Sequence, residues 1–106
     1  MTRSVLVFSI LPGRRDDFVA ALGRLQVLRR ASRQQGFRGA QLHVSVDGSD
    51  EALVTADWDS PEAYQGWLEN PLRAEMQAEL GPLLAAEPVP GVYEVLEDVG
   101  PEADSR

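Results

Sequence analysis

The chain has 106 residues, of which 43% are hydrophobic, and its formal net charge is −7. The length suggests one domain, and the absence of cysteine excludes disulfides and thiolate metal sites. All ten basic residues are arginines, so a lysine Schiff base is excluded, and the negative charge argues against a nucleic-acid partner.

The chain begins with Met1-Thr-Arg-Ser and runs directly into apolar residues, which is unlike the layout of a signal peptide. No apolar run approaches the roughly 20 residues needed to cross a bilayer. We therefore expect a cytoplasmic protein with no membrane partner.

The first third of the chain predicts a strand followed by a helix. Ser4–Ile10 is short and rich in β-formers, and Leu11-Pro-Gly13 ends it. Asp16 and Asp17 suit the first turn of a helix, and Gly36 suits its left-handed end. The helix is expected to bury one stripe, formed by Phe18, Leu22, Leu25 and Leu28.

The middle of the chain predicts a hairpin. Ala40–Val46 alternates between apolar and polar residues, and His43 falls on the polar face. Asp47-Gly48 is a strong turn signal, and Ala52–Trp58 is the expected partner strand. His43 is the only histidine, and its neutral-range pKa makes it a candidate general base. The alternative is that this face is solvated or lies in an interface.

The last third predicts a second helix and a final strand. Ser60 is the expected N-cap and Pro61 the first helical residue, while Asn70-Pro71 predicts a break or kink. Leu72, Met76 and Leu80 continue an apolar stripe, and Val92–Leu96 is expected to be the last strand. We expect one domain over residues 1–99 and a disordered polar tail over residues 100–106.

The expected order is therefore β-α-β-β-α-β, which is typical of an α+β, ferredoxin-like fold with an antiparallel sheet and both helices on one face. The predicted strands carry apolar residues on both faces, which is more than a one-sided sheet requires. A second sheet packed face to face would bury this surface, so we expect a homodimer.

Aromatic residues gather where the third strand passes into the second helix. Trp58 ends the strand, and Tyr64 and Trp67 follow on the first turns of the helix. Rings at such a junction can wall a pocket for a flat apolar molecule. The competing interpretation is ordinary core packing for both tryptophans and a surface position for Tyr64.

Several motifs together resemble the antibiotic biosynthesis monooxygenase family, whose members form dimeric α+β barrels. The resemblance covers about residues 4 to 98 and implies a cofactor-independent monooxygenase that acts on an aromatic, polyketide-type small molecule with dioxygen. The motifs are Leu11-Pro-Gly-Arg-Arg-Asp-Asp-Phe18, Gly36-Phe-Arg-Gly39, Asp47-Gly48, Trp58-Asp-Ser-Pro-Glu-Ala-Tyr64 and Pro90-Gly-Val-Tyr-Glu-Val95.

The resemblance also assigns residues. Trp58 and Tyr64 match a tryptophan–tyrosine pair of the quinone-forming oxygenases, whereas Val54 and Gln77 stand where those enzymes use an asparagine and an arginine. Trp67 matches a tryptophan of the haem-degrading branch, but Gln77 replaces its histidine ligand, so no haem is expected.

The candidate catalytic residues are therefore His43, Tyr64 and Trp58, with no metal and no cofactor. Candidate substrate-binding residues are Trp67, Gln77, Val54 and Met76. The sequence leaves two other functions as alternatives. One is a polyketide cyclase or isomerase without oxygen chemistry, and the other is a dimeric barrel that binds a small metabolite without turnover.

Overall fold

A computed structural model describes residues 1–102 of the chain. The elements follow the expected α+β order, with each predicted helix divided into two. They are β1 (Thr2–Ser9), α1 (Arg15–Leu25), α2 (Val27–Ala31), β2 (Phe37–Val44), β3 (Glu51–Trp58), α3 (Pro61–Leu68), α4 (Leu72–Leu80), a 3₁₀ turn η1 (Gly81–Leu83) and β4 (Val89–Glu94).

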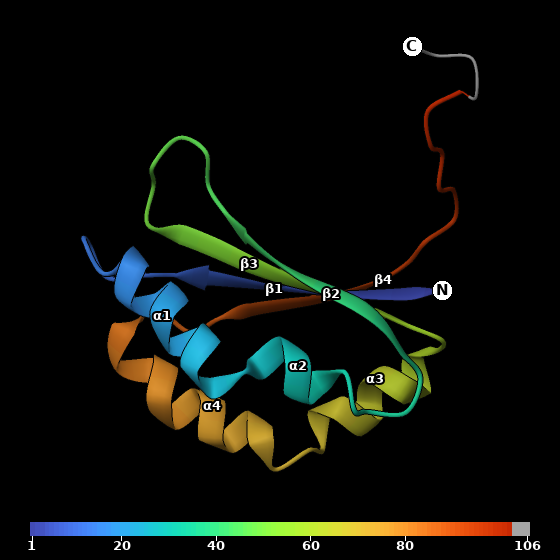
Figure 1. Ribbon diagram of the computed structural model, residues 1–106, viewed down its shortest axis with the longest axis horizontal. Helices are drawn as coiled ribbons and strands as arrows, with labels where there is room; N and C mark the ends of the chain where they lie inside the picture. The colour runs from blue at the N-terminus through green and yellow to red at the C-terminus, as the bar shows by residue number, and fades with distance from the viewer. Residues whose placement is uncertain (103–106) are drawn as a thin grey trace.

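The four strands form one antiparallel sheet in the order β2-β3-β1-β4. All four helices lie on the same side of this sheet, as Figure 1 shows. The predicted ferredoxin-like arrangement is thus confirmed. In the part of the chain that the structure describes, no helix combines the length and apolarity needed to span a membrane.

Strand pairing assigns each residue to a face. Ser4 pairs with Ala56 and Leu6 with Val54 on the inner face, which the helices cover. Their neighbours along the strands point to the outer face, which no described element covers. The core is built from the inner face and the helix residues that meet it, including Phe8, Phe18, Ala52, Trp58 and Leu80.

The first predicted helix is not continuous. Gln26 takes a left-handed conformation with φ of 54°, which ends α1 and starts α2. Leu22 and Val27 are both buried, yet five residues turn an unbroken helix by about 140° and would point them apart. The break places Val27 in the core, while Leu25 and Leu28 of the expected stripe are half-buried, so the prediction was wrong in treating the helix as continuous.

The other helix begins and breaks where the sequence predicts. The Ser60 hydroxyl accepts a hydrogen bond from the Ala63 amide at 3.2 Å, which is an N-cap. The Asn70 side chain accepts from the Leu72 amide at 3.0 Å and donates to Gln34 at 3.3 Å, which fixes the junction between α3 and α4. This break lets α4 take its own path beneath the sheet (Figure 1).

The last strand lies earlier than predicted. It spans Val89–Glu94 rather than Val92–Leu96, and Pro90 pairs with Leu6 of β1. A proline is tolerated here because β4 is an edge strand with one free side. Of the predicted polar tail, residues 103–106 lie outside the described residues.

Candidate functional site

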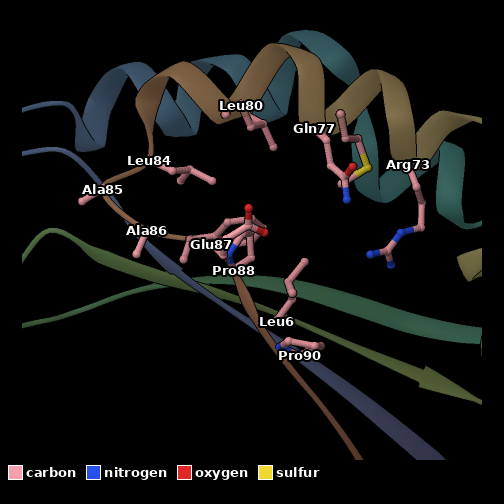
Figure 2. Close-up of a pocket in the computed structure, with 13 residues that line it drawn as sticks. Leu6, Arg73, Gln77, Leu80, Leu84, Ala85, Ala86, Glu87, Pro88 and Pro90 are labelled. Atoms are coloured by element: carbon pink, nitrogen blue, oxygen red, sulfur yellow. The ribbon is translucent and has the colours of Figure 1, made fainter.

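A cavity of about 510 Å³ lies between α4 and the β1–β4 side of the sheet. The α4 helix supplies its roof and the two strands its floor, while the segment after η1 closes one end (Figure 2). The apolar part of the wall comes chiefly from Leu6, Phe8, Met76, Leu80, Leu84 and Pro90. This size is within the range of small-molecule sites.

The local sequence explains why this space is not filled. On the floor, Pro90 is the partner of Leu6 and is smaller than the aromatic or branched residues common in strands. The closing segment contains Ala85 and Ala86, whose side chains are too short to reach α4. At these three positions the wall opposite α4 is therefore formed by short side chains.

Three polar side chains enter this otherwise apolar wall. Figure 2 shows Arg73 and Gln77 extending from α4 toward the sheet, and Glu87 directing its carboxylate inward from the closing segment. Arg73 is half-buried, and no carboxylate among residues 1–102 forms an ion pair with it. The site thus offers a cation, an amide and a carboxylate around an apolar floor.

The predicted aromatic cluster forms, but it encloses little space. Trp58 is fully buried, and its ring lies 5.5 Å from that of Phe37, 6.1 Å from Tyr64 and 6.4 Å from Trp67. The hollow beside these rings holds only about 40 Å³. For comparison, an engineered cavity that admits benzene measures about 150 Å³. Core packing therefore describes both tryptophans, whereas the alternative of a surface position for Tyr64 is wrong, because Tyr64 is buried in the same cluster.

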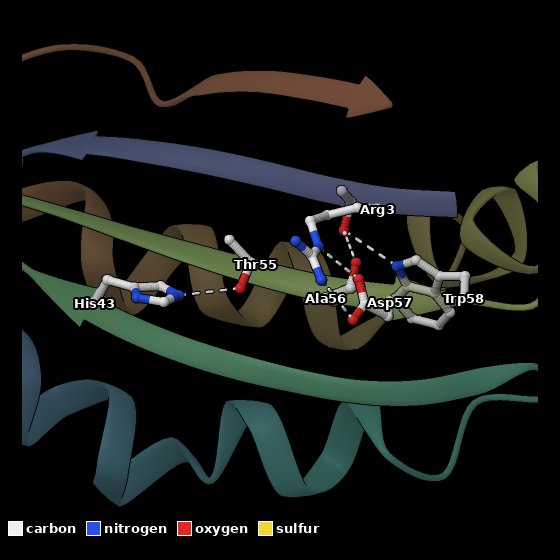
Figure 3. Close-up of polar contacts among 7 residues, drawn as sticks. Arg3, His43, Thr55, Ala56, Asp57 and Trp58 are labelled. Carbon is white, nitrogen blue, oxygen red and sulfur yellow. Dashed lines mark hydrogen bonds and ion pairs between the residues drawn. The ribbon is translucent and has the colours of Figure 1, made fainter. Parts of the chain in front are cut away.

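Trp58 also makes a polar contact that the sequence did not suggest. Its indole Nε1–H donates to the Ser4 hydroxyl at 3.1 Å on the inner face (Figure 3). Val54 lines only this small hollow. The small hollow and the large cavity adjoin, because Leu6, Phe8, Arg73 and Met76 line both.

His43 lies on the opposite side of the sheet from both hollows. It pairs with Leu53 in register, on the outer face, and its Nε2 is 3.1 Å from the Thr55 hydroxyl (Figure 3). The structure therefore does not bring His43 together with Tyr64 and Trp58. A histidine in this position cannot reach a molecule held under α4, because the sheet stands between them.

A second polar contact marks the outer face. Arg3 and Asp57 are directly opposite each other on β1 and β3, and two hydrogen bonds of 2.7 and 3.0 Å join them. The Arg3 guanidinium holds the pKa of Asp57 below its usual value, chiefly through these hydrogen bonds. The same contact raises the pKa of Arg3.

Of the predicted substrate-binding residues, Gln77 and Met76 line the large cavity, while Trp67 and Val54 line only the small hollow. Arg73 and Glu87 also line the cavity, and neither was predicted from the sequence. Arg73 had a usable signal, since it lies one turn before Gln77 on the same helix. Glu87 had no such signal in the sequence, because it lies outside the helices and strands. Only the path of the folded chain places it at the cavity.

An antiparallel four-stranded sheet with all helices on one face defines a ferredoxin-like α+β protein, and a polar-edged apolar cavity lies beneath one of its helices. The family model of antibiotic biosynthesis monooxygenases matches residues 1–79. The chain therefore belongs to the antibiotic biosynthesis monooxygenase family.

Solved structures support the same fold. SnoaB, a cofactor-independent oxygenase from Streptomyces nogalater, is 19% identical, with 92% of this chain and 95% of that chain covered and a TM-score of 0.76. Rv0793 from Mycobacterium tuberculosis is 21% identical, with 93% and 98% covered and a TM-score of 0.78. No curated protein matches the chain in sequence. At these identities the likeness establishes the fold.

Proposed function

We propose that the protein is a cofactor-independent monooxygenase that oxidises a flat, aromatic, polyketide-type molecule in the cavity under α4. The observation that carries this proposal is the cavity of about 510 Å³ itself, with an apolar floor and three polar side chains at its walls. Membership of the family and the structural likeness to SnoaB support the reaction class.

This chemistry asks three things of a protein. It must bind an electron-rich ring system, accept a proton from it, and stabilise the resulting anion away from bulk water. The anion can then pass an electron to dioxygen directly. Leu6, Leu80 and Pro90 offer the ring contacts, and the polar residues on α4 and the closing segment offer the rest.

Oxygen uptake with anthrone as substrate tests the proposal. We expect uptake above the protein-free blank, and we expect Ala86→Trp to lower it at least about tenfold because an indole would occupy the cavity. Ala78→Trp, on the exposed part of α4, is the matched control. His43→Ala, on the far side of the sheet, is expected to retain uptake within about twofold.

Two results would contradict the proposed monooxygenase activity in this cavity. Consumption of anthrone without oxygen uptake would favour the cyclase or isomerase alternative. Equal losses in Ala86→Trp and Ala78→Trp would show that the cavity is not where the reaction occurs.

We further propose that two copies pack their outer faces together. That face carries the apolar side chains of Val5, Val7, Leu53, Val89 and Tyr93, of which the last two are well exposed in a single copy. Burying them against an identical face would remove this apolar surface from water. Sedimentation at micromolar concentration should give twice the 11.6 kDa of one chain. A strictly monomeric mass would contradict the proposal.

A further inference from the structure

Arg73 is the first observation that extends the proposed function. The residue as a whole is half-buried, its guanidinium faces the apolar floor of Leu6 and Pro90, and it has no ion-pair partner among residues 1–102. By contrast, Arg24 and Arg30 of the neighbouring helices pair with carboxylates on the outside of α4. A cation left unpaired at an apolar cavity favours an anion on the bound molecule.

Glu87 is the second observation. Glu87 is an exposed residue, and it lines the same cavity from the closing segment, while Arg73 lines it from α4 (Figure 2). The two residues do not form an ion pair with each other, although both line one cavity. The cavity therefore separates a carboxylate and a guanidinium across an apolar space.

We propose that Glu87 is the proton acceptor and Arg73 the oxyanion-binding residue of the reaction, an inference that rests on the proposed function. In this step the C–H bond opposite the carbonyl of an anthrone-like ring breaks. The proton passes to the Glu87 carboxylate, and the electron pair moves through the ring to the carbonyl oxygen. That oxygen becomes negative and is stabilised by the Arg73 guanidinium.

This arrangement also defines the class of substrate. The acidic hydrogen and the oxygen that becomes negative must lie on opposite sides of one flat ring, so that each reaches its own residue. A neutral ring without a carbonyl gives Arg73 nothing to stabilise. The protein as a whole has a charge of −7, so the attraction for the anion must come from this local cation.

The proton-transfer step can be measured apart from oxygen. Anthrone is incubated with the protein in deuterated buffer under argon, and loss of the C–H signal opposite the carbonyl is followed by proton NMR. We expect exchange well above the blank for the natural sequence, and losses of about 100-fold for Glu87→Gln and for Arg73→Gln. Arg73→Lys should recover part of the loss because it restores the charge.

Matched controls carry the same change of charge outside the cavity. Glu62→Gln on α3 and Arg29→Gln on α2 are exposed, do not line the cavity, and should exchange within about twofold of the natural rate. Circular dichroism and quenching of tryptophan fluorescence by anthraquinone establish that each variant is folded and still binds a ring.

The outcomes separate this inference from the proposed function. Wild-type exchange in Glu87→Gln and Arg73→Gln, or oxygen uptake in air that these variants leave undiminished, overturns the inference alone. Absence of exchange above the blank in the natural sequence also overturns it. Exchange that depends on both residues but is followed by no oxygen uptake in air upholds the inference and contradicts the monooxygenase.

Discussion

Gly36 shows how closely the loop before β2 approaches the helix layer. Its φ is +83°, and a Cβ built on it would lie 2.5 Å from the Cβ of Ala63 on α3. Its carbonyl also accepts a hydrogen bond from the Asp59 amide at 2.8 Å. The sequence predicts a left-handed Gly36 at a helix end; the left-handed conformation is confirmed, but the residue lies in a loop packed against α3.

Gly36→Ala should therefore destabilise the protein by about 2 to 4 kcal/mol, because strain from the positive φ adds to the clash with Ala63. Urea unfolding followed by circular dichroism measures this change. In an Ala63→Gly background the clash disappears, so the further cost of Gly36→Ala should fall to about 1 to 2 kcal/mol. Equal costs in both backgrounds would contradict the close approach.

Individual site residues were predictable where they follow a strong local pattern. Trp58, Tyr64 and Trp67 come together as their positions at a strand–helix junction indicated. Whether rings enclose space or fill it depends on the volumes of neighbours from distant segments, such as Phe37 on β2. Sequence spacing does not contain this information. The pocket predicted beside these rings is therefore nearly filled in the structure, and the spacing could not have shown it.

Arg73 and Glu87 illustrate the opposite case. Each looks like an ordinary surface charge in the sequence, and only the path of the backbone brings both to one cavity. His43 illustrates a third case. Its place on a polar strand face was predicted correctly, but which face the helices cover is settled by the packing of the whole sheet.

The helices and strands were predicted best where a cap or turn residue marks them. The start of α3 at the Ser60 cap and the Asp47-Gly48 hairpin both form, and Asp47 accepts hydrogen bonds from the Ser45 hydroxyl and the Ser49 amide. These hydrogen bonds lower the pKa of Asp47 to about 2. In both cases the hydrogen bonds that determine the helix start or the turn join residues only a few positions apart in the sequence.

Elements fixed by distant contacts were predicted less well. The break at Gln26 serves the burial of Val27, and the strand position of Pro90 depends on its pairing with Leu6. The second difference bears on the site. The early start of β4 brings Pro90 under α4 as part of the cavity floor, and a strand over Val92–Leu96 would have left that position in a loop.

At the scale of the whole molecule, the two faces of the sheet carry different features. The inner face carries the core and, toward the β4 edge, the cavity with Arg73 and Glu87. The outer face carries exposed apolar residues, the Arg3–Asp57 pair and His43, and is the surface proposed to meet a second copy. The proposed chemistry and the proposed assembly thus use opposite sides of one sheet.

Locating a bound ring tests this division most directly. In NMR spectra of the protein with 1-hydroxyanthraquinone, ring protons should show nuclear Overhauser contacts to the methyl groups of Leu6, Met76 and Leu80, which line the cavity. No contacts to Val7 or Leu53 on the outer face are expected. Contacts confined to those outer-face methyl groups would contradict the cavity as the functional site.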